Sequence, residues 1–261
     1  METSKFIRAF WGNLDNFNQR HKIEINNTSK NKDLSEMVYV WGDKNCNYIK
    51  SLGFEVTKMS DKETEFGFDF LYDSDVYMIH KLEAIKKGID QFGSVIFLDW
   101  DCNQIKKIDS LFFEMIEQQD LGIQMPLYSY PKNYKEIIFK EWKEIPDKER
   151  EYVTKQDEFL KKHHYVLNDN FITPNAGFIY CSDSKIIDDI LLVNKEFDIK
   201  IATEEMAFTE YSKKKCNTLK DYIVRYEPLV CNAKYESHFN QKELNTYIST
   251  FIKKDLYFIH E

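Results

Sequence analysis

The first sixty residues alternate short apolar runs with a segment of helical periodicity. Lys5–Phe10 and Met37–Trp41 are compact runs typical of buried strands, and Phe54–Lys58 is a third strand candidate. Between the last two lies Asn45–Leu52, which predicts a short helix that the following glycine ends. An order of strand, helix and strand is typical of a parallel sheet in an α/β protein.

A longer amphipathic segment follows. In Asp75–Gln91 the apolar residues recur at helical spacing, and Gly93 is expected to end this helix. The next run, Ser94–Leu98, is apolar and too short for a core helix, so it predicts a central buried strand. Beyond it, Ile105–Gln119 is expected to be helical and Leu121–Met125 to form a strand.

The second half of the chain is less regular. Tyr128–Asn170 is the least regular segment, and within it the highly charged stretch Lys140–His164 is expected to be helical in part. No repeat and no Gly/Ser- or Pro-rich linker interrupts the chain, so one domain over residues 1–261 is expected. The further predicted elements are a turn at Pro174–Gly177 leading into an apolar run at Phe178–Cys181, helices over Lys185–Asn194 and Thr203–Lys214, and a strand over Tyr222–Tyr226.

The composition argues for a folded protein that does not bind nucleic acid. Of the 261 residues, 43% are hydrophobic and 15% aromatic, which is enough apolar surface to form a core. The formal net charge is -8, whereas a nucleic-acid-binding protein usually carries a basic face. An acidic protein that handles a phosphorylated ligand usually needs a cation between its carboxylates and the phosphates.

The cysteine pattern favours a reducing compartment. The five cysteines are scattered and include no C-x-x-C pair, so neither a zinc site nor a disulfide framework is expected. The first residues lack the apolar region of a secretion signal, and no run of about 18 uncharged apolar residues predicts a transmembrane helix. We therefore expect a cytoplasmic protein, and the sequence leaves its oligomeric state open.

Two carboxylates directly follow the predicted central strand. Asp99 and Asp101 come after Val95–Leu98, and ligands of open α/β sheets bind outside the carboxyl ends of the strands. Neighbouring carboxylates repel each other unless a cation lies between them, and hard oxygen ligands suit Mg²⁺ or Mn²⁺. The alternative is that Asp99 caps the next helix and Asp101 is merely solvated.

The segment Asp99-Trp100-Asp101 resembles the D-x-D strand of GT-A glycosyltransferases, where it binds a divalent metal and the sugar nucleotide. Later segments are similar to the glycogenin-like and lipopolysaccharide galactosyltransferase-like branch. Thr173–Ile179 is similar to its F-N-S-G-hydrophobic strand, and Thr203–Phe208 to its D-Q-x-x-hydrophobic helix start. Phe258–His260 is similar to the strand whose histidine supplies the last metal ligand.

The resemblance implies a fold and a metal site. The fold would be a GT-A (Rossmann-like) α/β domain with a mixed, mostly parallel central sheet flanked by helices. Residues 1–125 would form the nucleotide-binding half and residues 126–261 the half that binds the acceptor and the sugar. Asp101 would coordinate Mn²⁺ or Mg²⁺ directly, Asp99 would bind the metal or the ribose, and His260 would complete the ligand set. Without the resemblance, His260 reads as a frayed terminal residue.

The resemblance also implies residues that contact the donor. Asn175, Ala176 and Gly177 would lie against the donor sugar, because glycine permits close backbone approach and an asparagine amide can bind hydroxyls. An ordinary turn before a strand would look the same. Lys81 resembles a basic residue that relatives aim at the diphosphate, although an exposed helical lysine is an equally good interpretation.

Two further groups complete the predicted site. Phe10, Trp11 and Gly12 would lie beside the nucleotide base, where Trp11 could stack on a pyrimidine ring. Glu204 and Glu205 follow Thr203 at a predicted helix start and would be the catalytic carboxylates, as a general base or as a stabiliser of an oxocarbenium-like centre. The alternative is that they only stabilise the helix N-terminus.

The predicted function is a metal-dependent glycosyltransferase. It would move a sugar from a nucleotide-sugar donor, a UDP-sugar by resemblance, to an acceptor hydroxyl on a glycan, and the resemblance favours retention of configuration. One alternative is a nucleotidyltransferase acting on sugar phosphates, which normally carries a Gly-rich, basic loop that the segment after Lys5–Phe10 does not match. Others are a non-catalytic carbohydrate-binding module of the same fold and a hydrolase with an aspartyl nucleophile.

Overall fold

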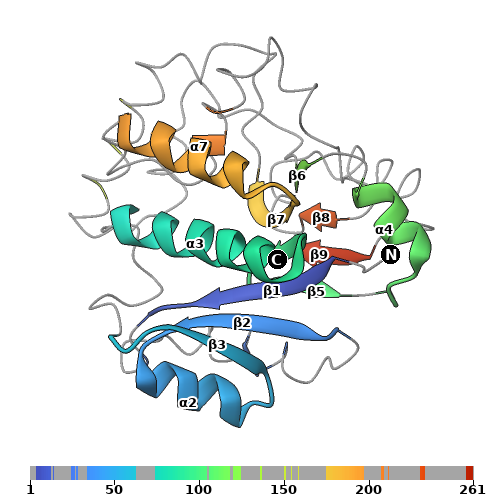
Figure 1. Cartoon of the computed structure of the whole chain (residues 1–261), viewed down its shortest axis with the longest axis horizontal. Coiled ribbons are helices and arrows are strands. Elements are labelled where there is room, and N and C mark those ends of the chain that lie inside the picture. Colours follow the sequence, from blue (N-terminus) through green and yellow to red (C-terminus); the bar gives the residue numbers. More distant parts are fainter. Residues whose placement is uncertain are drawn as a thin grey trace.

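The computed structural model describes residues 4–12, 14, 25–26, 28, 34–62, 74–104, 106–117, 120–124, 136, 150, 154, 158, 175–196, 207–208, 211, 230–232 and 257–260. The largest element within these residues is a six-stranded sheet in the order β3-β2-β1-β4-β7-β6 (Figure 1). Its strands are β1 (Lys5–Phe10), β2 (Glu36–Trp41), β3 (Glu55–Ser60), β4 (Val95–Leu98), β6 (Leu121–Gln124) and β7 (Asn175–Cys181).

The sheet is mixed and mostly parallel. The strands β3, β2, β1 and β4 run parallel, whereas β7 pairs antiparallel with both β4 and β6. The strand predictions hold closely, since β1 has the predicted bounds and β4 begins one residue later than expected. These central strands are buried along nearly their whole length, which is why continuous apolar runs identified them.

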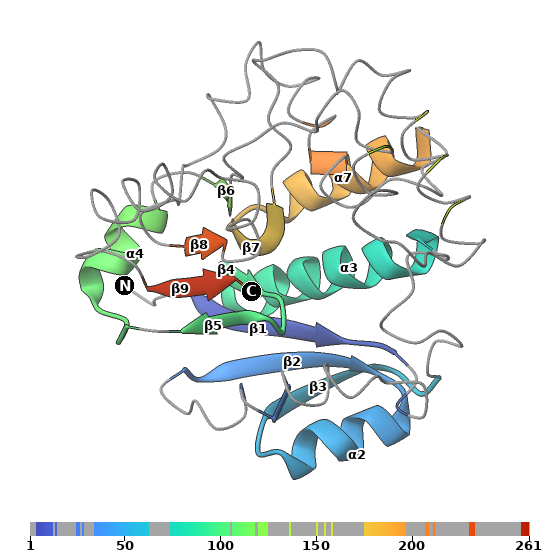
Figure 2. The ribbon, with the colours of Figure 1, turned by 180° about the vertical axis from the view of Figure 1, so that it is seen from behind.

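A second sheet of three strands lies beside the first, in the order β5-β9-β8 (Figure 2). It consists of β5 (Cys102–Gln104), β8 (Val230–Asn232) and β9 (Phe258–His260). The strand β9 pairs antiparallel with β5 and parallel with β8. Because only three residues separate the end of β4 from the start of β5, this small sheet fixes the chain that leaves the carboxyl end of β4.

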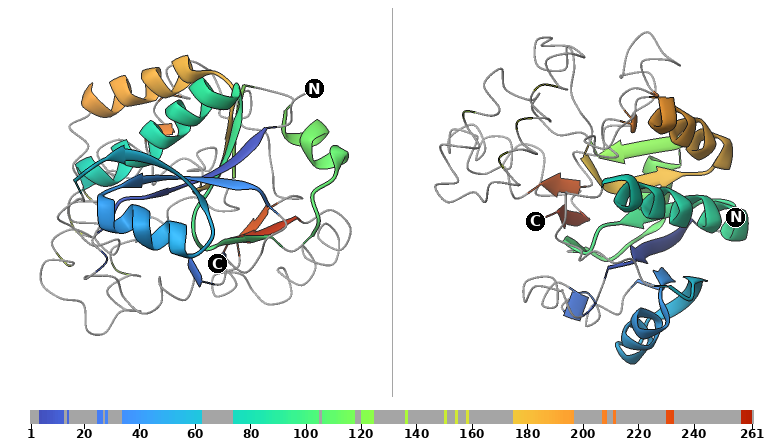
Figure 3. Two further views of the ribbon diagram at one scale, coloured as in Figure 1. Left: turned by 60° about the horizontal axis from the view of Figure 1, so that its bottom comes forward. Right: turned by 90° about the vertical axis from the view of Figure 1, so that its left-hand side faces the viewer.

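Helices cover both faces of the six-stranded sheet (Figure 3). The helices α3 (Ser74–Phe92) and α7 (Ser184–Glu196) pack their apolar residues on one face. On the other face lie α2 (Asp43–Ser51), α4 (Ser110–Ile116) and the small sheet. The prediction of an α/β fold with a helix-flanked, mostly parallel sheet is therefore confirmed.

Glycines end two of these helices, as the sequence predicts. Gly53 after α2 has φ +89° and Gly93 after α3 has φ +80°, a region that favours glycine. The Gly93 amide donates to the Ile89 carbonyl at 2.8 Å, which satisfies one of the last carbonyls of α3.

The helix predicted over Ile105–Gln119 is only partly correct. The chain first forms β5, and α4 begins at Ser110, where the Asp109 carboxylate accepts the Phe112 amide at 3.1 Å. The Lys106 amide also bonds the Tyr257 carbonyl at 3.4 Å. The backbone of β5 and Lys106 therefore pairs with residues 257–260, which are distant in sequence. The local spacing of apolar residues could not predict such pairing.

The turn predicted at Pro174–Gly177 is wrong for its last three residues, which begin β7. Strand pairing overrides the local turn propensity here, since Asn175 pairs with Gln124 and the Gly177 carbonyl accepts the Asp99 amide at 2.9 Å. Of the helix predicted at 203–214, the structure describes only Ala207, Phe208 and Tyr211, which are helical and buried.

Several predictions lie outside the described residues. The strand over Tyr222–Tyr226 and the segment Tyr128–Asn170, apart from single positions, belong to this group. The division into two halves at residue 125, the single domain and the cytoplasmic location stay predictions. In the described part of the chain, no helix combines the length and the apolar character needed to cross a membrane.

Candidate functional site

The two predicted metal-binding aspartates lie in a tight turn between β4 and β5. The Cys102 amide donates to the Asp99 carbonyl at 2.9 Å, so Asp99, Trp100, Asp101 and Cys102 form a β-turn, called here the acidic turn. The Asp99 and Asp101 side chains are both partly exposed. Asp99 does not cap the following helix, because α4 has Asp109 as its cap.

Lys81 of α3 binds Asp99. Its ammonium lies 2.9 Å and 3.1 Å from the two Asp99 carboxylate oxygens and 3.2 Å from the Ala176 carbonyl of β7. The Lys81 side chain is fully buried, and its ammonium sits 5.2 Å from the centroid of the Phe97 ring. The interpretation of Lys81 as an exposed helical lysine is therefore wrong. Three predicted donor-site residues, from α3, the end of β4 and β7, converge at one point.

The strand register brings His260 close to the acidic turn. His260 pairs with Cys102, the residue after Asp101, in the antiparallel ladder of β9 and β5. The side chains of His260 and Asn175 are not among those the structure describes. Among the side chains it does describe, no group of three His, Cys, Asp or Glu residues is placed to hold a metal ion.

Aromatic side chains gather at the carboxyl ends of β1 and β2. The Trp11 ring meets the Trp41 ring edge to face at 6.5 Å, and the His80 ring lies 4.3 Å from Trp41 and 6.0 Å from Trp11. The Asn45 amide donates to the carbonyls of Gly12 and Trp41, both at 2.7 Å, which ties together the loops after the two strands. His80 directly precedes Lys81, so the same turn of α3 contributes one side chain to this cluster and one to the Lys81–Asp99 pair.

Phe10 lies on the other side of β1. Its ring is fully buried and packs against Trp100 at 6.1 Å and Tyr48 at 6.2 Å. Alternation along a strand points neighbouring side chains to opposite faces, so Phe10 and Trp11 serve different cores. Any contribution of Phe10 to a base site would come from its backbone. The predicted catalytic residues Glu204 and Glu205 lie outside the described residues.

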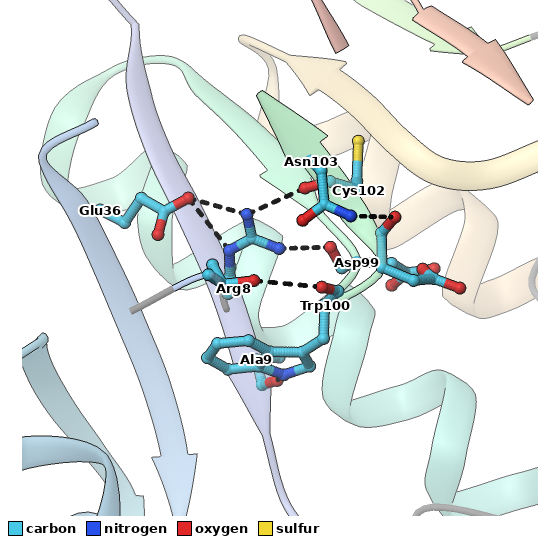
Figure 4. A network of polar contacts seen from close by, with 9 residues as sticks. Arg8, Ala9, Glu36, Asp99, Trp100, Cys102 and Asn103 are labelled. Atoms are coloured by element: carbon cyan, nitrogen blue, oxygen red, sulfur yellow. Dashed lines mark hydrogen bonds and ion pairs between the residues drawn. The ribbon is translucent and has the colours of Figure 1, made fainter. Parts of the chain in front are cut away.

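Two charged residues under the acidic turn escaped the sequence prediction. Arg8 of β1 is 1% exposed, and its Nε and Nη2 donate to Glu36 Oε1 at 3.0 Å and 2.9 Å (Figure 4). The same guanidinium donates from Nη1 to the Asp99 carbonyl and from Nη2 to the Cys102 carbonyl at 3.2 Å. One feature of the sequence could have indicated a buried charge here, because Arg8 interrupts the apolar run of a central strand.

The thiol of Cys102 is chemically inert in this setting. Burial raises the pKa of the Cys102 thiol well above its ordinary value, Asp101 and Asp99 raise it further, and Arg8 opposes them. The thiolate is the reactive form of cysteine, so burial and the raised pKa make Cys102 a poor nucleophile. The described groups at the acidic turn that remain for binding a ligand include the carboxylate oxygens of Asp99 and Asp101 and the Lys81 ammonium.

Comparison with known proteins supports the fold. No protein-family model and no curated protein sequence matches the chain significantly. The fold is similar to that of mouse xyloside xylosyltransferase 1, with a TM-score of 0.54, 11% identity and coverage of 99% of this chain and 97% of that one. It is also similar to the galactosyltransferase LgtC, solved with donor and acceptor sugar analogues, with a TM-score of 0.52, 13% identity and coverage of 98% and 86%. The predicted GT-A-type fold is therefore confirmed.

Proposed function

We propose that this protein is a metal-dependent glycosyltransferase that moves a sugar from a nucleotide-sugar donor to an acceptor hydroxyl. The observation that carries the proposal is the convergence of Lys81, Asp99 and Ala176 beside the acidic turn, at the carboxyl end of a central strand. Ligands bind at this edge in open α/β sheets. The similarity in fold to two solved sugar transferases supports the same class of reaction.

The residues at the acidic turn fit a hard divalent cation. Asp99 and Asp101 are two residues apart, and carboxylate oxygens are the ligands that Mg²⁺ and Mn²⁺ prefer. His260, whose backbone pairs with Cys102, is the proposed third protein ligand. A bound Mn²⁺ or Mg²⁺ would supply Lewis-acid neutralisation of the diphosphate leaving group.

The chain's own residues would bind and orient the donor. The Lys81 ammonium would hold Asp99 in place and add positive charge near the diphosphate. Asn175, Ala176 and Gly177 at the start of β7 would face the donor sugar, and Ala176 already contacts Lys81 through its carbonyl.

The nucleotide base would lie at the end of β1, next to Trp11, Gly12 and the backbone of Phe10. Trp11 contacts Trp41 and His80 there, and His80 directly precedes Lys81 on α3. A base there and a diphosphate beside Lys81 would span neighbouring parts of one sheet edge. UDP-sugars are the proposed donors.

The chemical step would use a carboxylate outside the described residues. When the nucleoside diphosphate leaves, positive charge develops on the anomeric carbon and an acceptor hydroxyl attacks it. Glu204 or Glu205 would stabilise this charge or accept the hydroxyl proton. We propose a glycan acceptor and retention of configuration.

The direct test is a donor-hydrolysis screen with the full chain. Nucleoside diphosphate release is measured across a panel of nucleotide sugars with Mn²⁺, Mg²⁺ or EDTA. We expect release from one donor, abolished by EDTA and by Asp101→Asn. Asp90→Asn, which alters an exposed carboxylate on α3, is the matched control and should keep full activity.

Other results of the donor-hydrolysis screen would favour a different function for the protein. Turnover that survives EDTA and Asp101→Asn would contradict the metal-dependent proposal. Nucleotide-sugar binding without turnover would point to a non-catalytic carbohydrate-binding module, and release of pyrophosphate from a nucleoside triphosphate with a sugar phosphate would point to a nucleotidyltransferase.

A further inference from the structure

A charged residue occupies the middle of the central strand β1. Arg8 lies between Phe6 and Phe10 on the same face of the sheet, and both of these side chains are buried in apolar clusters. Glu36, at the start of β2, pairs with Phe6 in the strand register and is therefore the diagonal neighbour of Arg8. Burying two charges is unfavourable unless they bind each other and their remaining donors find partners.

The remaining donors of Arg8 reach both ends of the acidic turn. The guanidinium uses Nε and Nη2 for Glu36 and directs Nη1 to the Asp99 carbonyl and Nη2 also to the Cys102 carbonyl (Figure 4). Asp99 and Cys102 are the first and last residues of the turn, so one planar group holds both ends.

Neighbouring contacts fix the middle of the turn. The Trp100 indole donates to the Ala9 carbonyl at 2.9 Å, and the Thr28 hydroxyl donates to the Trp100 carbonyl at 3.3 Å. The Arg8 guanidinium carbon also lies 5.3 Å from the Trp100 ring centroid. Contacts from β1 and from Thr28 thus hold the acidic turn in place. The position of the two aspartates therefore depends on the sheet beneath them.

Arg8 and Glu36 carry opposite charges that partly offset each other, and Arg8 contacts the turn through two backbone carbonyls, so its direct effect is on the shape of the turn. An apolar pair of similar volume would usually stabilise a fold as well as a buried ion pair does. A guanidinium holds its donors in a fixed planar fork, and this shape lets Arg8 bind Glu36 and both turn carbonyls at once. We therefore interpret the contacts of Arg8 as a means of fixing the shape of the acidic turn rather than of stabilising the fold.

We infer that the buried Arg8–Glu36 pair is a positioning device that holds the acidic turn in the shape needed for Asp99 and Asp101 to bind one cation. This inference rests on the proposed function for its catalytic meaning. Removal of the pair should loosen the turn and weaken metal binding without unfolding the sheet. Groups that orient metal ligands typically affect metal affinity by about 10–100-fold.

The experiment compares the full-length wild type with the double variant Arg8→Met/Glu36→Met, which removes both charges at similar volume. Arg8→Lys is the second variant, because it keeps the positive charge and loses the planar arrangement of donors that the guanidinium provides. Tyr39→Phe, which removes a partly buried hydrogen bond to Gln91 on the α3 side of the sheet, is the matched control. Two quantities are measured: amide hydrogen exchange by peptide, and Mn²⁺ binding by electron paramagnetic resonance in the presence of UDP.

We expect faster exchange confined to the peptide covering residues 99–104 in both Arg8 variants, and Mn²⁺ binding weakened by about tenfold or more. The Tyr39→Phe control should match the wild type in both measurements. If the double variant does not fold, Arg8→Lys decides. Unchanged exchange at 99–104, or unchanged Mn²⁺ affinity with a loosened turn, would overturn the inference. A wild type that binds no Mn²⁺ would count against the proposed function, and the exchange result would still decide whether Arg8 holds the turn.

Discussion

The buried ammonium of Lys81 joins three parts of the chain that are far apart in sequence. It belongs to α3, and it contacts the Asp99 carboxylate and the Ala176 carbonyl. A fully buried charge needs such partners, because burial without them is strongly unfavourable. The pair also compensates one of two neighbouring carboxylates, which would otherwise repel each other.

This contact leads to a prediction for Lys81→Met. The substitution leaves Asp99 without its ammonium partner, and we expect donor hydrolysis to fall by about 10²-fold, as when one charge-stabilising donor is removed from an active site. Steady-state kinetics with the donor found in the hydrolysis screen measures this. Lys86→Met, one turn and a half along α3 in a half-exposed pair with Asp188, should keep wild-type kinetics. Equal loss in both variants would show that Lys81 has no special role.

The burial of three cysteines predicts low reactivity of their thiols. The thiols of Cys46, Cys102 and Cys181 are buried, and burial raises the pKa of the Cys181 thiol to about 12. Since the thiolate is the reactive form, these three cysteines should react with a thiol reagent only after denaturation. Peptide mapping by mass spectrometry after labelling at pH 8 checks this. Rapid labelling of Cys102 in the native protein would contradict the burial described here.

Among the elements, α3 approaches the sheet closely at Gly88. A Cβ atom at this position would lie 2.8 Å from Val95 Cγ1 and 3.1 Å from Ile7 Cδ1. Val95 belongs to β4 and Ile7 to β1, so the absent side chain allows the helix to contact both strands. Valine has little freedom to move aside because it is branched at Cβ.

Gly88→Ala should therefore destabilise the protein. We expect overpacking to cost about 1–3 kcal/mol in the free energy of unfolding, against a gain of roughly 1 kcal/mol in helix propensity, so the net loss is up to about 2 kcal/mol. Urea denaturation measures the difference. Lys87→Ala, at an exposed neighbouring position of α3, should leave stability nearly unchanged. A Gly88→Ala protein more stable than the wild type would refute the close approach.

The strand β9 is anchored to α4 by one carboxylate. The Tyr257 hydroxyl donates to Asp109 Oδ1 at 2.7 Å, and the same carboxylate caps α4 through the Phe112 amide. The hydrogen bond from Tyr257 is the main cause that lowers the pKa of the Asp109 carboxyl below its ordinary value of 3.8. Asp109 therefore helps to fix the strand that carries the backbone of His260.

A pH dependence follows from this lowered pKa. The native state favours the ionised carboxylate, so its contribution to stability is present above pH 3.8 and is lost as the pH falls through the lower, native-state pKa. We expect Asp109→Asn to have a lower Tm than the wild type at neutral pH. In acid, where the wild-type carboxylate is protonated, the difference in Tm between the two proteins should become smaller. Thermal unfolding across this pH range tests it. Tyr257→Phe should reproduce part of the effect, and a pH-independent difference would contradict the assignment.

The elements differ in how far the sequence could predict them. Strands β1 and β4 and helix α3 are recognisable because their burial imposes a local period on apolar residues. The short strand β5 has only three residues, and its partner β9 lies more than 150 positions away, so no local pattern could reveal it. The Pro174–Gly177 segment misled the prediction for the same reason, since pairing with β6 and β4 decided its conformation.

At the scale of the whole molecule, the fold assembles the candidate site from distant segments. The resemblance predicted that Asp99, Ala176 and Lys81 share a site, and strand order places them in contact. The Arg8–Glu36 pair could not be assigned from the sequence, because only the adjacency of β1, β2 and β4 brings it under the acidic turn.

The central claim is that one divalent cation lies between the two aspartates of the acidic turn. The most direct test is anomalous diffraction at the manganese edge from crystals of the full chain soaked with MnCl₂ and UDP. We expect a single anomalous peak joined to carboxylate oxygens of Asp99 and Asp101, with the His260 imidazole in the same coordination shell. Carboxylates that point apart, with no anomalous peak at the turn, would contradict it.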